Sequence, residues 1–328
     1  MYMHRPFIFA FPKNHHLNRS ALFSNLTWLN AAIGLALLAC QSVFGSIPIT
    51  LQLVYFIAMI AVTGIPHGAL DHIVASANTK KLGRQFHFGK FLLKYLIAVL
   101  LYAICWIFIP AWSLLFFLII SAWHFGETDI PNFNKEWIWN INRLLWGSFV
   151  LLLILLTHQQ ETTTILMRIT SNSTSVKSIW SLLCKNEIAV LLTVGLPVFT
   201  LSAYNAFKHS KQFSFSCFAN LTIILLISIY LPLLPAFAIY FGGWHAIRSF
   251  ELIFQFLTSQ KHHQKMNIMS MWLKTIPMTL LAALFFIVAS FTWSTLGIST
   301  DPLPVVFIFL SVITLPHLDV MNQMIKNS

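Results

Sequence analysis

Apolar segments of about 20 residues recur along the whole sequence, and this recurrence limits the possible folds more than any other feature. As an α-helix rising about 1.5 Å per residue, such a segment spans the roughly 30 Å hydrocarbon core of a bilayer. The predicted spans are residues 28–45, 48–68, 91–109, 111–126, 139–157, 187–206, 214–231, 233–256, 270–292 and 303–322. The sequence therefore predicts an all-α fold, a polytopic transmembrane helix bundle of about ten helices.

The composition agrees with a bundle that lies in lipid. Of the 328 residues, 57% are hydrophobic and only 9% are charged, which is far from the balance of soluble globular domains. The N-terminal residues are basic and contain no apolar run long enough for a signal peptide. We predict a cytoplasmic N-terminal segment at residues 1–27 and a single transmembrane helical domain at residues 28–328.

Positive charges predict which side of the membrane each loop faces, because cytoplasmic loops are enriched in Lys and Arg. With the N-terminus inside, the basic residues within 80–94, 208–211 and 261–274 fall on the cytoplasmic side, and only the loop at 158–186 opposes this pattern. Both termini are therefore predicted to be cytoplasmic, in a multi-pass protein of the cell's inner (plasma) membrane. The net charge of +11 is spread over these loops, so no nucleic-acid partner is predicted.

Four histidines lie inside predicted spans, where an ionisable side chain is expensive. A charged group there costs on the order of 2–3 kcal/mol, so its presence calls for a reason. The four are His67, His124, His245 and His317, each in the inner half of a span that runs inward. Neutral imidazole binds iron, zinc and copper, and bundles build metal sites from side chains on facing helices. The histidines therefore predict a metal site, with helix packing or a proton relay in a membrane carrier as alternatives.

Polar neighbours follow three of these histidines at short spacing. They are Asp71, His72, Glu127 and Asp319. A metal-binding histidine commonly donates its second ring N–H to a carboxylate, so we expect these acids to orient the ligands. Asp71 follows His67 by four residues, which places both on one helix face, and Glu127 has the same relation to His124 at a spacing of three. His72 is a candidate for an alternative ligand or for a partner of one.

Large aromatic side chains stand beside the histidines in the sequence. They are Trp123, Phe125, Phe241, Trp244 and Phe250. Aromatic walls of this kind suit a long, apolar, conjugated ligand, and we predict that these residues line a substrate site. Aromatic residues also fill helix packing in membranes, which is the alternative interpretation.

Four short motifs carry the histidines: PHGALDH around His67, WHFGETD around His124, WHAIR from Trp244, and LPH ending at His317. In order and spacing, including the 57 residues from His67 to His124, they resemble the Brp/Blh family of bacterial and archaeal membrane β-carotene 15,15′-dioxygenases, which supply retinal to rhodopsins. The resemblance runs from the second predicted span to the end of the chain. It implies bound Fe(II), O₂ as co-substrate, cleavage of the central double bond of β-carotene to retinal, and a functional link to a retinal-binding rhodopsin.

One motif departs from the family pattern. The family's third motif continues as WHxxxH, whereas Ser249 stands here at the second histidine position, and a neutral hydroxyl is a poor iron ligand. The resemblance implies that the first three histidines are ligands and that His317, His72 or water completes the set. The alternative is a diverged member with another apolar substrate or no oxygenase activity. No GxxxxGK[ST], GxSxG or HExxH motif occurs, so nucleotide hydrolysis, serine hydrolysis and zincin chemistry are not predicted.

Overall fold

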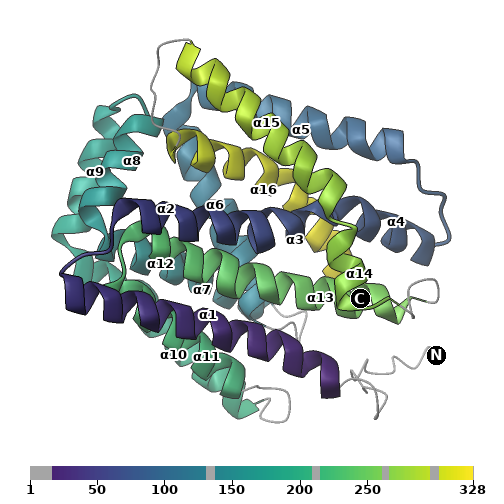
Figure 1. Ribbon diagram of the computed structural model, residues 1–328, viewed down its shortest axis with the longest axis horizontal. Coiled ribbons are helices and arrows are strands. Elements are labelled where there is room, and N and C mark those ends of the chain that lie inside the picture. Colours follow the sequence, from purple (N-terminus) through teal and green to yellow (C-terminus); the bar gives the residue numbers. More distant parts are fainter. Residues whose placement is uncertain (1–16, 131–136, 209–214, 261–265, 296–302, 328) are drawn as a thin grey trace.

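The computed structural model describes residues 17–130, 137–208, 215–260, 266–295 and 303–327, which are helical apart from short connections (Figure 1). In chain order the α-helices are α1 (Leu17–Phe44), α2 (Ile49–Met59), α3 (Ile65–Ala69), α4 (Asp71–Lys81), α5 (Phe88–Phe108), α6 (Pro110–Asp129), α7 (Trp137–Thr157), α8 (Gln159–Ile169), α9 (Thr174–Lys185), α10 (Glu187–Lys208), α11 (Phe215–Tyr230), α12 (Leu233–Tyr240), α13 (Ala246–Ser259), α14 (Ile268–Leu273), α15 (Ile276–Thr295) and α16 (Leu303–Lys326). No strand occurs in these five ranges. The all-α prediction is therefore confirmed.

Seven helical stretches in the described part of the chain are long and apolar enough to cross a membrane. They are Leu22–Phe44, Ile49–Lys81, Phe88–Phe108, Trp137–Thr157, Glu187–Lys208, Ile268–Thr292 and Leu303–Lys326. The chain is thus a multi-pass membrane protein. The count of ten spans and the cytoplasmic placement of both termini remain predictions.

Three of the ten predicted spans fall outside this set, each for a local reason. α6 covers the span predicted at 111–126, but its last two turns carry a histidine and two carboxylates, which lower its apolar content. In the described part of the chain α11 is a helix of 16 residues, shorter than the helical stretches of this set. The span predicted at 233–256 is divided into α12, a π-helical turn and α13. Polar site residues and helix irregularities therefore account for most of the difference.

The segment at residues 158–186, predicted as an external loop, contains the two short helices α8 and α9. α8 buries Thr162, Leu166 and Ile169, which recur at helical spacing on one face. On α9 the side chain of Trp180 is buried, and its Nε1 donates a hydrogen bond to Thr163 Oγ1 at 2.6 Å. The polar side chains that interrupt the apolar pattern here therefore belong to the outer faces of amphipathic helices.

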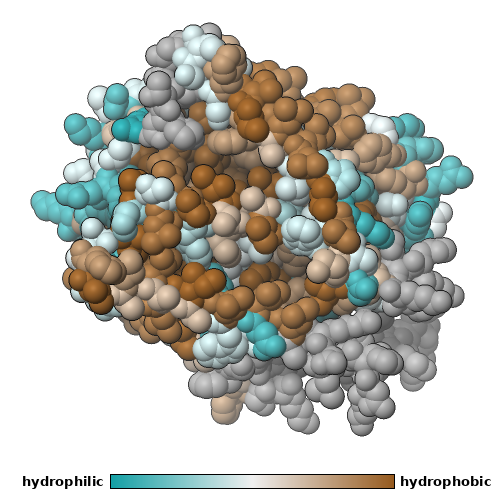
Figure 2. Space-filling view, in the orientation of Figure 1, coloured by the Kyte–Doolittle hydropathy of each residue, from teal (hydrophilic) through white to brown (hydrophobic). Residues whose placement is uncertain are grey.

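Apolar side chains cover much of the outer surface, as Figure 2 shows for one face. On α15 the exposed fraction is 64% for Leu280, 62% for Ile287 and 70% for Phe291. On α5 Leu93 and Leu100 are 61% and 60% exposed. Soluble monomers rarely expose large contiguous apolar patches. The hydrocarbon core of a bilayer is the environment that matches this surface.

Two π-helical turns, η1 and η2, lie at the first and third histidines of the predicted cluster. They are η1 (Ile60–Gly64), three residues before His67, and η2 (Phe241–His245), which ends at His245. The two turns pack against each other at glycines. A Cβ placed on Gly242 would lie 2.9 Å from Met59 Cβ, so this close approach depends on glycine. π-turns inside α-helices are found frequently at functional sites.

The two ends of the bundle carry different elements (Figure 1). α8 and α9 lie at the left end in this view, whereas α4, α14 and the C-terminus lie at the right end. Residues 158–186 therefore lie opposite the connection between α4 and α5, which is the relation that the predicted order of spans requires. Which end faces the cytoplasm remains a prediction.

Candidate metal centre

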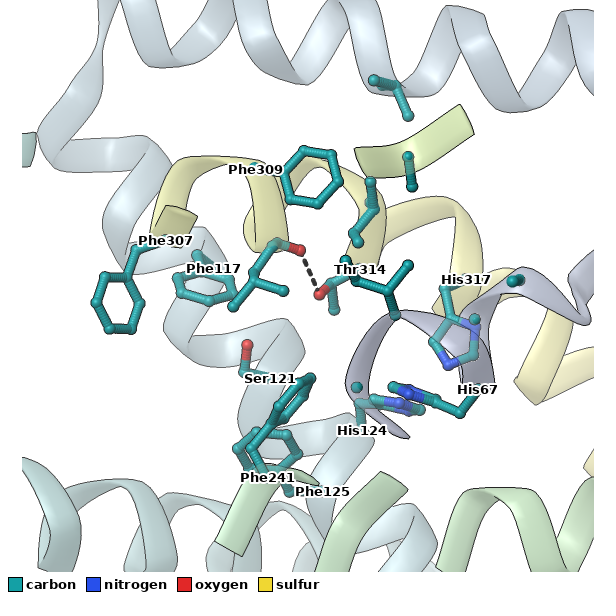
Figure 3. Close-up of a pocket in the computed structure, with 18 of the residues that line it drawn as sticks. His67, Phe117, Ser121, His124, Phe125, Phe241, Phe307, Phe309, Thr314 and His317 are labelled. Carbon is teal, nitrogen blue, oxygen red and sulfur yellow. Dashed lines mark hydrogen bonds between the residues drawn. The ribbon is translucent and has the colours of Figure 1, made fainter. Parts of the chain in front are cut away.

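Three of the predicted histidines meet in the interior of the bundle (Figure 3): His67 from α3, His124 from α6 and His317 from α16. One ring nitrogen of each lies within 4.8 Å of those of the other two. His245, at the end of η2, joins them, with its ring centroid 4.7 Å from that of His124 and 5.6 Å from that of His67. All four side chains are buried. The fold thus brings together the four histidines that stood out inside the predicted spans.

Close helix packing fixes the helices that carry these residues. α16 packs against α4, α5 and α6. α6 and α7 cross where both are glycine: a Cβ on Gly126 would lie 1.8 Å from the carbonyl oxygen of Arg143, and one on Gly147 would lie 1.8 Å from that of Ala122. Small residues at crossings let membrane helices approach closely. This crossing holds α6 in place around His124.

Most ring nitrogens in the cluster have no hydrogen-bond partner in the described part of the chain. Both nitrogens of His124 and of His245, Nε2 of His317 and Nδ1 of His67 are buried and unpaired. An unpaired buried polar atom costs about 1–3 kcal/mol, so several in one place call for a ligand. Imidazole nitrogen is a common ligand of iron and other transition metals. The donor set therefore fits an iron ion.

Asp71 is the carboxylate that orients one of the four rings. Its Oδ1 accepts a hydrogen bond from Nδ1 of His317 at 2.7 Å, and its Oδ2 accepts one from the Tyr95 hydroxyl at 3.1 Å. We expected Asp71 to orient His67 instead. The shared-face argument requires a continuous helix, but α3 ends at Ala69 and α4 begins at Asp71. The break turns the carboxylate toward α16.

The other predicted polar neighbours have different surroundings. Glu127 is buried and interacts electrostatically with Arg143 of α7, while its Oε2 has no hydrogen-bond partner in the described ranges. Asp319 is exposed, and its Oδ2 accepts a hydrogen bond from Gln323 at 2.8 Å. His72 is half-buried, with Nδ1 3.1 Å from the carbonyl oxygen of Ala69. Asp319 therefore faces away from the buried cluster, and one ring nitrogen of His72 contacts a backbone carbonyl oxygen.

Two of the five predicted aromatic residues line a cavity beside the histidines. They are Phe125, with its ring centroid 4.7 Å from that of His245, and Phe241, with its ring centroid 5.9 Å from that of His67. The remaining three lie elsewhere in the packing: Trp123 donates to Asn322, Trp244 donates to Asp129, and Phe250 packs in a buried apolar cluster. Proximity in sequence therefore did not separate wall residues from packing residues.

Asp129 is a site residue that the sequence reasoning did not single out, although it ends the motif WHFGETD. It is buried, and its carboxylate accepts three hydrogen bonds: from Trp244 Nε1 at 2.8 Å, Tyr240 OH at 3.0 Å and Trp146 Nε1 at 3.1 Å. Tyr240 directly precedes the π-turn Phe241–His245, and Trp244 lies within that turn. Asp129 thus ties that turn to α6 and α7. An acid at the end of an apolar span was the signal available for finding it.

A cavity of about 440 Å³ adjoins the histidine cluster. His67, His124 and His317 are in its wall, and most of the remaining wall consists of aliphatic and aromatic side chains. Figure 3 shows Phe117 and Phe307 on the side of the cavity away from the histidines. A space with this lining suits an apolar ligand.

The cavity opens on the lipid-facing surface alongside α15. Leu281 and Phe285 of α15 and Leu96 of α5 line the cavity and are 55%, 48% and 54% exposed. Figure 2 shows a hollow near the centre of this face, surrounded by apolar side chains. An apolar molecule dissolved in the bilayer can therefore reach the histidines without passing through water.

Ser249 lies one helical turn after His245 on α13. Its side chain is fully buried, and Oγ has no hydrogen-bond partner among the described residues. The position of the family's second histidine is therefore inside the protein and close in sequence to the cluster, but it carries a weak ligand. His317 supplies a further imidazole from α16.

Comparison with known proteins gives one consistent result. Residues 58–325 match the sequence model of the family described as Beta-carotene 15,15'-dioxygenase. A relative named Beta-carotene 15,15'-dioxygenase, from uncultured marine bacterium 66A03, is 25% identical over 262 residues, which cover 80% of this chain and 90% of the relative. No solved structure matches the chain. The matched region contains all four clustered histidines.

Proposed function

Because the chain belongs to the β-carotene 15,15′-dioxygenase family, as its histidine motifs predicted, we propose that it cleaves the central double bond of β-carotene with O₂ to give two molecules of retinal. The observation that carries the proposal is the position of the histidines. His67, His124 and His317 are buried together in the wall of an apolar cavity that opens toward lipid. A carotenoid is an apolar polyene that dissolves in the bilayer, so this cavity matches its chemistry.

We assign the metal ligands to His67, His124, His245 and His317, with His317 in the role that the family's WHxxxH motif gives to the residue at Ser249. The unpaired Nε2 of His317, fixed by the bond from Nδ1 to Asp71, supports this assignment. Iron, when bound, would supply the activation of O₂. His72 is a weaker candidate because its Nδ1 lies against a backbone carbonyl.

The proposed reaction requires little acid–base catalysis by the protein. The carbon–carbon double bond breaks, each of the two carbons gains one oxygen atom of O₂, and no proton or external reductant is consumed. The chain's residues therefore have to bind the polyene, hold its central bond near the histidines and exclude water. The apolar walls from Phe125, Phe241 and Phe117 suit the binding role.

Two alternatives predict different surroundings for the histidines. A proton relay in a carrier requires a polar or hydrated path through the protein, whereas the cavity described beside the cluster has a mostly apolar wall. A diverged member would keep the apolar cavity and accept another apolar substrate. The first test therefore has to measure the metal and the product in the same preparation.

The decisive experiment uses the full chain purified in detergent, with iron measured by elemental analysis and retinal formation from β-carotene assayed under air and under nitrogen. We expect near-stoichiometric iron and retinal only under air. In His317→Ala we expect iron to be lost and retinal formation to fall by more than the about 100-fold typical of outer partners of a metal. The matched control is His87→Ala, because His87 is exposed at the start of α5.

Each outcome has a distinct meaning. Iron without retinal would contradict the substrate assignment and favour a diverged member. A protein without metal would contradict the metal site and favour packing or a relay. Full activity in His317→Ala would remove His317 from the ligand set. The inner-membrane location remains a prediction from the sequence, and the link to a retinal-binding rhodopsin remains a prediction of the family resemblance.

A further inference from the structure

The cavity beside the histidines is elongated along the helices. On α6 its wall runs from Leu114 to Phe125, and on α16 it runs from Phe307 to His317. Each stretch covers about ten residues, which corresponds to about 15 Å at 1.5 Å per residue. On α16 the histidine is the last wall residue, and on α6 only Phe125 follows it. One arm of the cavity therefore extends about 15 Å from the histidines toward the N-terminal ends of α6 and α16, while on their other side the wall continues over residues of α4 and α5.

The end remote from the histidines is closed. It is lined by Ile154 of α7 and by Thr162, Leu166 and Ile169 of α8, which are 3%, 2%, 8% and 6% exposed. These values contrast with the half-exposed residues at the opening beside α15. Leu166 and Ile169 pack in one buried cluster with Trp180 of α9, so α9 covers this end from outside.

We propose that this closed end binds one terminal ring of the carotenoid and thereby determines which double bond lies at the histidines. The proposal rests on the proposed function and names the residues that set its regiospecificity. A conjugated polyene is a stiff rod, so fixing one end fixes the position of every bond along it. Leu166 and Ile169 are then specificity-determining residues, although they lie far from the reacting bond.

The physical reason for the ring to occupy the closed end is close packing. In the closed, apolar end the ring contacts fixed side chains on all sides, whereas at the opening part of its surface contacts mobile lipid chains. The arm of about 15 Å is of the order of half the length of a carotenoid with a ring at each end. A symmetric substrate seated in this way presents its central bond to the histidines from either end.

The test changes the depth of the closed end and measures the products. In Leu166→Ala the ring can move deeper, which carries the central bond past the histidines and places an off-centre bond there. We expect one aldehyde longer and one shorter than retinal, with the ratio of off-centre to central cleavage rising about 10-fold or more, since one methylene in an apolar pocket is worth at least this factor. Products are separated by liquid chromatography of reactions on β-carotene.

The matched control is Leu156→Ala. Leu156 belongs to the same buried cluster as Leu166 but does not line the cavity. The same truncation at this position is expected to lower stability without changing the ratio of products. An equal shift in Leu156→Ala would show that loosened packing changes the products, and would overturn the role of the closed end.

A filled variant gives an independent measurement if the truncated protein fails to accumulate. Leu166→Phe shortens the arm, so we expect kcat/KM for β-carotene to fall about 10-fold, with a smaller loss for a carotenoid whose ends are acyclic. An equal loss on both substrates would overturn ring binding at α8. If the wild type makes retinal and Leu166→Ala gives the same ratio of products, ring binding at α8 would also be overturned. If the wild type forms no retinal from β-carotene, the proposed function itself would be wrong.

Discussion

A hydrogen-bonded pair of side chains determines how His317 presents its ring. Nδ1 donates to Asp71 at 2.7 Å, which leaves Nε2 as the nitrogen with a free lone pair. Tyr95 donates to the other carboxylate oxygen at 3.1 Å and so keeps Asp71 from rotating. The three residues come from α16, α4 and α5. Ring orientation at the cluster therefore depends on contacts between helices that are distant in sequence.

Replacing Asp71 by Asn is expected to weaken iron binding without unfolding the protein. The amide keeps the shape of the carboxylate but loses its charge, so it holds the Nδ1–H of His317 less firmly. Loss of such a partner typically costs about 10–100-fold in metal affinity, and we expect a decrease in this range. The measurement is an iron titration against a competing chelator in detergent.

Asp319→Asn is the matched control for this substitution, because Asp319 is only two residues from His317 but is exposed and pairs with Gln323. We expect its iron affinity to equal that of the wild type. Equal losses in the two variants would indicate a general effect of charge near α16. The orienting role of Asp71 would then be wrong.

The sequence identified the histidines because an imidazole inside an apolar span needs an explanation. It did not identify their partners correctly. Asp71 was assigned to His67 by helix periodicity, and the break between α3 and α4 changed its direction. Asp129 was not singled out because its three donors come from α7, α12 and η2. Partners across helices follow from packing, which a single sequence does not contain.

At the scale of elements, α6 and α7 cross in close contact at the site. The two helices approach through Gly126 and Gly147, where an added Cβ would lie 1.8 Å from a backbone carbonyl oxygen of the other helix. Backbone cannot move aside as a flexible side chain can. The position of α6, and with it the position of His124, therefore depends on glycine at both positions, because any side chain there would force the two helices apart.

Gly126→Ala is expected to destabilise the protein by about 3 kcal/mol, the upper part of the range for overpacking, because α6 and α7 must separate. The measurement is the midpoint of thermal unfolding in detergent, monitored by tryptophan fluorescence. Gly89→Ala on α5 is the control, since a Cβ added there would meet no atom within 4 Å. Alanine in a helix is favoured over glycine by about 0.5–1 kcal/mol, so its midpoint should stay equal or rise. Equal midpoints in both variants would contradict the importance of the crossing.

Span prediction succeeded for helices that are continuous and apolar along most of their length, and it missed a helix irregularity. α5, α7 and α16 coincide with predicted spans to within a few residues. The segment from 233 to 256 was predicted as one helix, and its π-turn at Phe241–His245 was not foreseen. π-turns occur mostly as single interruptions of α-helices, frequently at functional sites. This one contacts the other π-turn, Ile60–Gly64, and that contact is between segments distant in sequence.

At the scale of the whole molecule, the arrangement of the two ends makes the predicted topology testable. α8 and α9 lie opposite α4 and the C-terminus (Figure 1). The charge rule predicts that the α4 end is cytoplasmic. The two ends must in any case face different sides if the long helices cross the bilayer.

Reporter fusions test this orientation directly. We expect green fluorescent protein joined after Lys81 to be fluorescent and alkaline phosphatase joined there to be inactive, because that position is predicted to be cytoplasmic. After Ser173, between α8 and α9, the opposite pattern is expected. The same pattern at both positions would contradict a bundle that spans the membrane with these ends on opposite sides, and a reversed pair would invert the topology.

Because the cavity opens beside α15 toward lipid, the relevant substrate concentration for this protein is the one in the hydrocarbon phase. Leu281 and Phe285 lie where the cavity reaches the apolar surface, so a ligand enters from hydrocarbon. The amount of lipid or detergent sets the volume of this hydrocarbon phase. Occupancy then follows the mole fraction of carotenoid in that phase, and adding empty micelles at constant total carotenoid should slow the reaction by dilution. Saturation curves plotted against molar concentration would shift with every change of detergent, while curves plotted against carotenoid per micelle would superimpose.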